Sequence, residues 1–550
     1  MEPVTLGDVY RLSMERNPKP DRYLRKRNGA WEPVSAAALD RDVRGCAAAL
    51  AALGIGRGDR VAILSYNRYE WAVADWACQL LGVADVPIYS TLPADQVQFI
   101  LKDAGAKAVF VENAGQAAKV GDLKAIAFDP APGTTPFAEF IAGKGEPPRV
   151  AIAADDLATL IYTSGTTGVP KGVMLTQRNL VSNLTTCCSI LDCSAEDVVL
   201  SFLPLSHSFE RILDYALFWK GAAIAHAEDV DKVVPNLAEI RPTLMGAVPR
   251  FYEKIYAKVR ESTAKMPGWK RGLFEWARKT GGAEAEYRRR GERAPLGLRL
   301  RMSIARWLAL GKMAKRLGGR MRLLVSGGGA LSRDVNEYLW SLGFTVLEGY
   351  GLTETSPVLC INLSKKTKLG TVGPPIPGVE IKIAADGEIL ARGPNIMKGY
   401  LNRPEDTAAV LKDGWFATGD IGELDADGFL RITDRKKDLL KTSNGKYIAP
   451  QPIENKLKLS PHVLNAIVIG DRQKFPAALI VAAPGATRER VGEAVEAVNK
   501  DLPHHEKIVK FAMLDQDFTI EGGELTPTMK VKRRAVEKKY ASVISGLYES

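Results

Sequence analysis

The sequence is poor in the residues that build metal centres and disulfide frameworks. Six cysteines and five histidines are scattered over 550 residues without paired metal-ligand spacing, so neither a zinc site nor a disulfide-stabilised domain is indicated. No apolar run approaches the roughly 18 residues that a membrane-spanning helix needs. The first residues lack the basic and apolar regions of a signal peptide. These absences predict a soluble protein of the reducing cytoplasm.

Acidic residues are scarce in one segment, from Lys258 to Arg322. It holds 19 Lys/Arg against five Glu and no Asp, an excess that is larger than the +11 of the whole chain. Aromatic and leucine residues lie among these charges: Trp269, Phe274, Trp276, Leu298, Leu300, Trp307 and Leu308. The mixture suits peripheral contact with an anionic membrane, worth about 1 kcal/mol per basic residue near the surface. A solvated helical pair with no specific partner would have the same composition. No recognised nucleic-acid-binding motif accompanies the charge, so we expect no nucleic-acid partner.

Helical and strand patterns alternate through the first 150 residues. Helical spacing at 36–53, 70–81 and 92–104 alternates with buried-strand patterns at 58–64, 84–88 and 106–111. Such alternation implies a largely parallel sheet with helical crossovers. A chain of 550 residues also exceeds what one hydrophobic core usually supports. We predict an α/β fold: a large N-terminal α/β region of several subdomains with mostly parallel sheets, and a small α+β C-terminal domain with strands at 462–470 and 477–482 and a helix at 487–502.

The densest polar pattern is the loop from Thr163 to Gly172, Thr-Ser-Gly-Thr-Thr-Gly-Val-Pro-Lys-Gly. Apolar runs flank it at 157–161 and 173–175, which predicts a strand, a loop and a second strand. Its hydroxyls, its glycines and Lys171 supply anion donors, and it contains no acidic residue. It does not satisfy the Gly-x-x-x-x-Gly-Lys-Ser/Thr pattern of the common nucleotide loop. A flexible surface turn would explain the glycines but not this density of donors, so we predict a polyphosphate-binding loop.

Other motifs follow along the chain. They are the glycine turn Ser326–Leu331, the run Leu347–Thr355, the run Gly414–Asp420, the charged block Asp434–Asp438, and a glycine-rich C-terminal loop, Gly522–Arg533. In the second motif Glu354 can hold Mg²⁺, which usually takes only one or two carboxylates together with substrate phosphates. In the third, Asp420 suits a ribose diol.

Together these motifs resemble the AMP-binding, adenylate-forming superfamily of acyl-CoA synthetases, luciferases and nonribosomal adenylation domains. The resemblance runs from about residue 5 to residue 540, with the motifs in family order. Three stretches are similar to long-chain fatty acyl-CoA synthetases in particular: Asn67–Trp71, Val86–Leu92 and Val248–Ile255.

The resemblance implies the site residues. Those expected to contact ATP are Thr163, Ser164, Gly165, Thr166, Thr167, Gly168, Lys171, Gly328, Gly329, Glu348, Gly349, Tyr350, Asp420 and Arg435. The expected catalytic residues are Thr353, Glu354, Lys530 and Lys441, with Glu354 as the Mg²⁺ ligand, and Gly445 is expected beside the pantetheine of coenzyme A. His207, Phe209 and Tyr252 are the expected acyl-substrate contacts. Some relatives have a tryptophan gate four residues after the histidine; here that position is Arg211, so no such gate is expected.

The resemblance also implies the activity and the domain division. A fatty acid would be activated with ATP to acyl-AMP and pyrophosphate, and coenzyme A would then form the thioester. The expected domains are residues 1–434 and a mobile C-terminal domain of residues 435–550, with a hinge near 435–441. Alternatives are an acyl-AMP ligase that loads a carrier protein, a luciferase-like oxygenase, and a non-catalytic binding protein at the membrane. The sequence indicates no oligomeric state.

Overall fold

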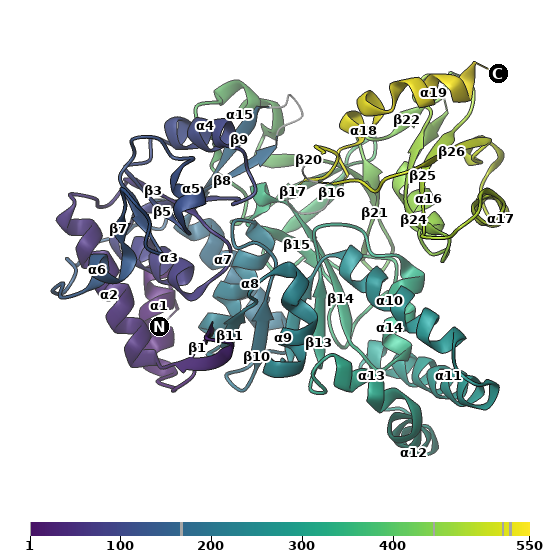
Figure 1. The fold of residues 1–550 in the computed structure, drawn as a ribbon, viewed down its shortest axis with the longest axis horizontal. Coiled ribbons are helices and arrows are strands. Elements are labelled where there is room, and N and C mark those ends of the chain that lie inside the picture. The colour runs from purple at the N-terminus through teal and green to yellow at the C-terminus, as the bar shows by residue number, and fades with distance from the viewer. Residues whose placement is uncertain (1, 165–168, 444–445, 520–521, 527–530, 550) are drawn as a thin grey trace.

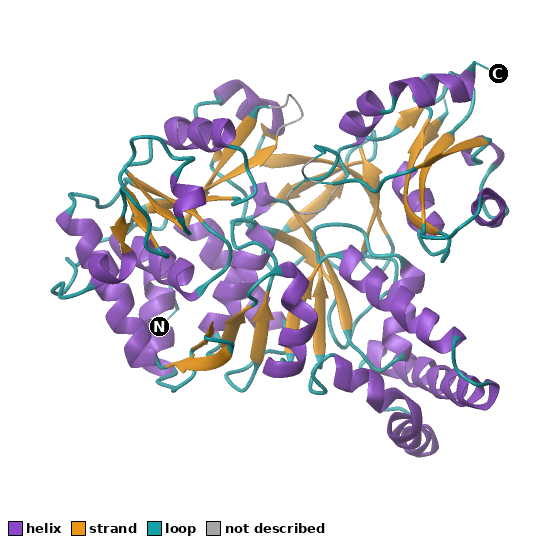
Figure 2. Ribbon diagram, viewed as in Figure 1, coloured by secondary structure: helices purple, strands orange, loops and turns teal. Residues whose placement is uncertain are grey.

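The computed structural model describes residues 2–164, 169–443, 446–519, 522–526 and 531–549. In this part of the chain two large mixed sheets and a smaller antiparallel sheet form the body of the molecule, with helices packed around them (Figure 1). The C-terminal elements, yellow in Figure 1, lie to one side. Figure 2 shows that they combine strands and helices. The predicted α/β fold with a small α+β C-terminal part is confirmed.

The first large sheet has the strand order β18-β9-β8-β4-β3-β5-β6-β7. The pairs from β8 to β7 are parallel, whereas β9 is antiparallel to both β8 and β18. Apart from Arg60 and Asp85, strands β3 to β5 are buried apolar runs, as expected when helices cover both faces of a parallel sheet. The strands are β3 (Arg60–Leu64), β4 (Ala84–Ile88), β5 (Ala108–Val111), β6 (Ala125–Ala127), β7 (Thr135–Pro136), β8 (Leu157–Ser164), β9 (Pro170–Thr176) and β18 (Gly399–Tyr400).

The second large sheet has the order β15-β14-β13-β12-β10-β11-β1-β2. Its pairs are parallel from β14 to β1, and the two edge strands are antiparallel. The carboxyl ends of β12, β13 and β14 therefore meet at one edge, where α/β sheets usually bind ligands. The strands are β1 (Tyr23–Arg27), β2 (Ala30–Val34), β10 (Val198–Ser201), β11 (Ala223–His226), β12 (Leu244–Ala247), β13 (Leu323–Ser326), β14 (Val346–Gly351) and β15 (Val358–Ile361).

The remaining strands are shorter or lie near the C-terminus. The third sheet is antiparallel and contains β16 (Glu380–Ile383), β17 (Glu388–Arg392), β19 (Leu411–Lys412), β20 (Trp415–Leu424) and β21 (Leu430–Arg435). The C-terminal strands are the hairpin β22 (Leu440–Lys441) and β23 (Tyr447–Ile448), and the sheet β24 (Val463–Ile469), β25 (Ala477–Ala482) and β26 (Lys510–Leu514).

Helices connect these strands. Through the first half they are α1 (Leu6–Arg16), α2 (Ala36–Ala52), α3 (Tyr69–Leu81), α4 (Ala94–Ala104), α5 (Ala114–Ala117), α6 (Phe137–Ile141), α7 (Gln177–Ile190), α8 (Ser208–Trp219), α9 (Val233–Ile240) and α10 (Pro249–Ala264). The others are α11 (Gly268–Arg290), α12 (Leu296–Ala305), α13 (Gly311–Arg316), α14 (Arg333–Ser341), α15 (Pro404–Val410), α16 (Pro450–Leu457), α17 (Arg488–Asn499), α18 (Arg533–Lys539) and α19 (Ala541–Tyr548), with a π-helical turn at Arg306–Leu310. None of the described helices is long and apolar enough to cross a bilayer.

The elements predicted in the first 150 residues are confirmed within about two residues. The polar loop differs more, because β8 and β9 continue their antiparallel pairing into it and place Thr163 opposite Lys171. The basic segment also has more elements than the helical pair that was given as the alternative to membrane contact. It contains the end of α10, α11, α12, the π-helical turn and α13, and Phe274 is buried rather than displayed among the charges.

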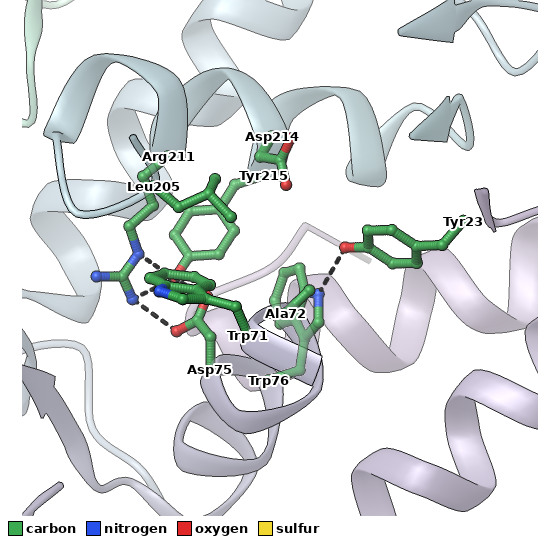
Figure 3. Close-up of a pocket in the computed structure, with 9 residues that line it drawn as sticks. All are labelled: Tyr23, Trp71, Ala72, Asp75, Trp76, Leu205, Arg211, Asp214 and Tyr215. Atoms are coloured by element: carbon green, nitrogen blue, oxygen red, sulfur yellow. Dashed lines mark hydrogen bonds and ion pairs between the residues drawn. The ribbon is translucent and has the colours of Figure 1, made fainter. Parts of the chain in front are cut away.

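A buried ion cluster joins α8 to three other elements, and Figure 3 shows the part of it formed by Arg211, Asp75 and Tyr215. Arg211 of α8 is 2% exposed, and its guanidinium lies 2.6 Å from an Asp75 oxygen of α3 and 2.7 Å from an Asp85 oxygen of β4. It also donates to the hydroxyl of Thr159 in β8, while the Tyr215 hydroxyl donates to Asp75. Because the contacts reach α3, β4 and β8, Arg211 fixes where α8 lies against the first sheet.

The cluster fills the space around it. The cavity that remains beside Arg211, Trp71 and Tyr23 is about 10 Å³, room for about one water molecule. Burial raises the pKa of Asp75 to about 7, and the Arg211 guanidinium acts in the opposite direction. At position 211, where some relatives have a gating tryptophan, this chain therefore has an arginine whose buried ion pairs hold α8 in place.

Arg211→Ala should destabilise the protein strongly, because two carboxylates would lose their shared cation inside the core. Breaking a buried ion pair by removing one partner costs about 3–5 kcal/mol. The urea midpoint of unfolding measures the change. The matched control is Arg299→Ala, an exposed arginine of α12 whose loss should change stability by about 0.5 kcal/mol or less. Equal midpoints for the two variants would contradict the anchoring role of Arg211.

Candidate functional site

The amino terminus of α8 meets the ends of two strands of the second sheet. His207 caps the helix, with its Nδ1 accepting from the Phe209 backbone N–H at 3.2 Å. The Ser208 hydroxyl lies 3.4 Å from the Thr353 hydroxyl, just after β14. The Phe209 ring packs on Gly327 after β13 so closely that a Cβ at this glycine would lie 3.0 Å from the ring. The predicted acyl contacts His207 and Phe209 thus lie beside the predicted catalytic Thr353.

The glycine turn after β13 needs glycine at Gly328. Its φ is +76°, in the left-handed region that favours glycine, whereas a Cβ at Gly329 would make only an ordinary contact with the ring of Pro249. Tyr252, a predicted acyl contact, is fully buried, and its hydroxyl donates to the Val325 carbonyl at 3.0 Å. Tyr252 therefore holds the strand that leads into this turn.

One tyrosine links the predicted metal ligand to the lysine of the polar loop. The Tyr400 hydroxyl donates to Glu354 at 2.9 Å, and the Lys171 ammonium lies 5.3 Å from the centre of the Tyr400 ring. Lys171 also pairs with Asp406 at 2.9 Å. Two motifs separated by about 180 residues in the sequence therefore meet here. Sequence reasoning missed Tyr400 and Asp406, because neither belongs to a spacing pattern and the contacts arise from the pairing of β18 with β9.

A second tyrosine holds the predicted ribose ligand. The Tyr350 hydroxyl donates to Asp420 at 2.6 Å. Burial and, next to it, the negative charge of Asp420 raise the pKa of the Tyr350 phenol. Asp420 lies opposite Arg435 in the β20–β21 pair, and its other oxygen lies 3.6 Å from the Arg435 guanidinium. The structure thus brings together the aromatic ring, the carboxylate and the cation that were predicted for adenosine. Two oxygens on one carboxylate suit a diol.

Glu348 faces α14. It is buried, accepts a hydrogen bond from Asn336 at 2.8 Å, and burial raises its pKa to about 7. The adjacent Gly349 pairs with Ile361 of β15. Glu348 thus connects β14 to α14 through its side chain.

The other predicted residues lie elsewhere or are not described. Lys441 is exposed on the β22–β23 hairpin, with its ammonium 5.3 Å from the Tyr447 ring. Predictions on Gly165, Thr166, Thr167, Gly168, Gly445 and Lys530, and on the side chain of Ser164, fall outside the described residues. In the described ranges no group of three or more His, Cys, Asp or Glu side chains could hold a metal. A metal at Glu354 would therefore rely on this carboxylate and on substrate oxygens, the ligand set that Mg²⁺ accepts.

Known proteins similar to this chain match most of its length. A family model described as "AMP-binding enzyme" matches residues 13–401, and one described as "AMP-binding enzyme C-terminal domain" matches residues 437–550. "Long-chain-fatty-acid--CoA ligase FadD15" of Mycobacterium bovis is 36% identical over 96% of this chain and 94% of the relative. "Long chain acyl-CoA synthetase 7, peroxisomal" of Arabidopsis thaliana is 32% identical over 94% of this chain and 82% of that protein.

Solved structures of similar shape include complexes with nucleotides. The anthranilate CoA ligase AuaEII in complex with anthranoyl-AMP has a TM-score of 0.77, 19% identity, and coverage of 99% of this chain and 98% of that chain, which supports the fold. O-succinylbenzoate coenzyme A synthetase (MenE) from Bacillus subtilis, in complex with ATP and magnesium ion, has a TM-score of 0.73 and 25% identity, covering 96% and 98%. With the two family models matching most of the sequence, the chain belongs to the AMP-binding enzyme family.

Proposed function

We propose that this protein is a long-chain fatty acid–CoA ligase that works through an acyl-adenylate. The observation that carries the proposal is the run from Tyr350 to Glu354 at the carboxyl end of β14. There Tyr350 bonds to Asp420, Tyr400 links Glu354 to Lys171, and Ser208 at the start of α8 lies beside Thr353. The names of the relatives, long-chain fatty acid–CoA ligase and long chain acyl-CoA synthetase, support the substrate class. The competing proposal is an acyl-AMP ligase that passes the acyl group to a carrier protein.

In the first step the fatty acid carboxylate attacks the α-phosphorus of ATP, and pyrophosphate leaves. Both reactants are anions, so fixed positive charge near the phosphoryl oxygens lowers the barrier. Lys171 and the loop 163–172 would hold the leaving phosphates, and Asp420 with Arg435 would hold the ribose. Tyr400 orients Glu354 as the residue to hold Mg²⁺, which when bound supplies positive charge to the phosphates. Lys530 would bridge the carboxylate and the α-phosphate. The nucleophile is already ionised, so no side-chain base is needed.

In the second step the thiol of coenzyme A attacks the acyl carbon, and AMP leaves. We propose that the C-terminal domain of residues 435–550 rotates about a hinge at 435–441 between the steps, withdrawing Lys530 and presenting Lys441 and Gly445. The gap between the two family matches, from 401 to 437, supports a division here. The contacts of α10 with the C-terminal elements are compatible with movement. Arg250 pairs with Asp517 at 2.9 Å, and Glu253 lies 3.8 Å from Lys458.

We further propose that the protein works in the cytoplasm, peripherally on the inner face of the membrane that holds its substrate. Trp269 is 70% exposed and Trp307 82% exposed, among the arginines and lysines of α11 to α13. Four aliphatic side chains near them are also exposed: Leu296, Leu300, Ile304 and Leu308. Exposed tryptophans beside basic residues are typical of surfaces that insert into anionic interfaces.

Fatty acid-dependent ATP–pyrophosphate exchange tests the first step, and Glu354→Gln should reduce it by about 10²–10³. The neutral amide keeps the size of the side chain and its contact with Tyr400 but removes the charge that would hold Mg²⁺. Glu496→Gln, at an exposed position of α17, is the matched control and should retain full exchange. If Glu354→Gln exchanged pyrophosphate as fast as the unchanged protein at ordinary Mg²⁺ concentration, the metal assignment would be wrong. Adding coenzyme A or a carrier protein then separates the two candidate functions.

The two half-reactions should respond oppositely to changes at Lys530 and Lys441. Lys530→Ala should lower adenylation by about 10²–10³ yet convert supplied acyl-AMP and coenzyme A at near-normal speed, because its charge serves only the attack on ATP. Lys441→Ala should impair thioester formation alone. Single-turnover assays of each step make the comparison, with exposed Lys500→Ala as the control. If each variant damaged both steps equally, the proposed rotation would be wrong.

Vesicle co-sedimentation tests the membrane proposal. Binding should rise with the fraction of anionic lipid and fall with salt, since exposed charges are screened within about 8 Å at physiological ionic strength. Trp307→Ser should weaken it, whereas Tyr447→Ser, an exposed aromatic of the C-terminal part, should not. Binding that is the same for neutral and anionic vesicles at every salt concentration would exclude this mode of attachment.

A further inference from the structure

A cleft of about 510 Å³ lies between α10, α11 and α14, apart from the candidate active site. These helices lie side by side at the lower right of Figure 1. The charged and aromatic side chains that line the cleft come from all three: Tyr256 and Arg260 from α10, Arg271, Glu275 and Arg278 from α11, and Tyr338 from α14. None of these residues is among those that we assign to ATP, coenzyme A or the fatty acid.

The two tyrosines form a platform for two of the arginines. Their rings pack edge to face, with centres 4.8 Å apart and an interplanar angle of 87°. The Arg260 guanidinium lies 5.5 Å from the centre of the Tyr256 ring and donates to its hydroxyl at 3.1 Å. The Arg278 guanidinium lies 5.5 Å from the centre of the Tyr338 ring. A guanidinium that rests on a ring keeps N–H groups along its edge for an anion.

The charges in the cleft do not balance. Arg278 pairs with Glu275 at 2.9 Å, but Arg260 and Arg271 form no ion pair with any carboxylate of the described residues. Three guanidinium groups facing one carboxylate leave an excess of two positive charges. A phosphate monoester carries about −1.5 to −2 near neutral pH, and its oxygens match the fork of an arginine.

We propose that this cleft binds the phosphate monoester group of a ligand. The volume admits the phosphate together with the part of the molecule that bears it, and the tyrosine platform gives that part an apolar wall. Two sources present the same chemistry: a small phosphate ester in solution, including the 3′-phosphate of coenzyme A, and a lipid with a monoester headgroup. The inference stands without the proposed ligase activity, because it rests on other side chains.

Calorimetric titration of the full-length protein with inorganic phosphate, at constant ionic strength, tests the site. Arg260→Ala and Arg271→Ala change exposed side chains and should leave the fold intact. Each should weaken phosphate binding at least about tenfold, as expected for losing one charge-assisted contact. Arg299→Ala, with the same change in charge on α12, should bind phosphate as the unchanged protein does. Binding of glycerol 3-phosphate, a phosphate monoester, should also strengthen as pH rises through about 6, where its phosphate gains its second charge.

Three pairs of probes identify the source. Coenzyme A is compared with dephospho-coenzyme A, glycerol 3-phosphate with glycerol, and phosphatidylcholine vesicles containing phosphatidic acid with vesicles containing phosphatidylglycerol. The pair whose difference disappears in Arg271→Ala, but persists in Arg299→Ala, names the ligand class. Absence of saturable phosphate binding, or equal loss in Arg271→Ala and Arg299→Ala, would overturn the proposal. ATP–pyrophosphate exchange should be unchanged in all three variants. Loss of exchange in one variant alone would mean that the substitution damaged the protein. Absence of exchange in every form, including the unchanged protein, would contradict the proposed ligase activity and not the phosphate site.

Discussion

The position of α8 depends on one buried cation. Arg211 lies between Asp75 and Asp85 in the core, where each of the three charges would be costly alone. The cluster fixes α8 against the first sheet, whereas the amino terminus of the same helix contacts the second sheet through Ser208 and Thr353. A short helix bonded at two points in this way sets the separation of the two sheets at the candidate site. The positions of His207 and Phe209 follow from this separation.

Tyrosine hydroxyls orient the two carboxylates that matter most in the candidate site. Tyr400 donates to Glu354 and Tyr350 donates to Asp420. Each hydrogen bond occupies one carboxylate oxygen with a neutral donor, so the carboxylate keeps its charge while its rotation is restricted. A lysine in the same position would orient the carboxylate but also neutralise it, and the attraction for a cation would fall. At Glu354 the site thus combines fixed geometry with available negative charge, whereas Asp420 also faces the Arg435 guanidinium at 3.6 Å.

Much of the fold could be predicted from the sequence, because its strands and helices are local patterns. The apolar runs of β3 to β5 and the capped helices between them agree with their predicted ranges within about two residues. The family motifs also led to the prediction that Thr353, Glu354, Tyr350 and Asp420 belong to one site; the structure joins Tyr350 to Asp420 by a hydrogen bond, and the common role stays a prediction. The sequence could not reveal Tyr400, Asp406 or the Asp75–Asp85–Arg211 cluster, because these contacts join segments with no fixed spacing. Phe274 was misplaced for a similar reason: composition cannot tell which side of α11 packs against α14.

The interactions differ in strength in a way that suits a two-step reaction. The first sheet holds α8 through a fully buried charge cluster, whose loss would cost several kcal/mol. By contrast, α10 meets the C-terminal elements through two partly exposed ion pairs, Arg250–Asp517 and Glu253–Lys458, and such pairs contribute about 1 kcal/mol or less each. A movement of the C-terminal part would therefore break weak contacts and leave the strong ones intact. The binding residues on β14 and β20 could keep their geometry while a different side chain is presented to the reacting carbon.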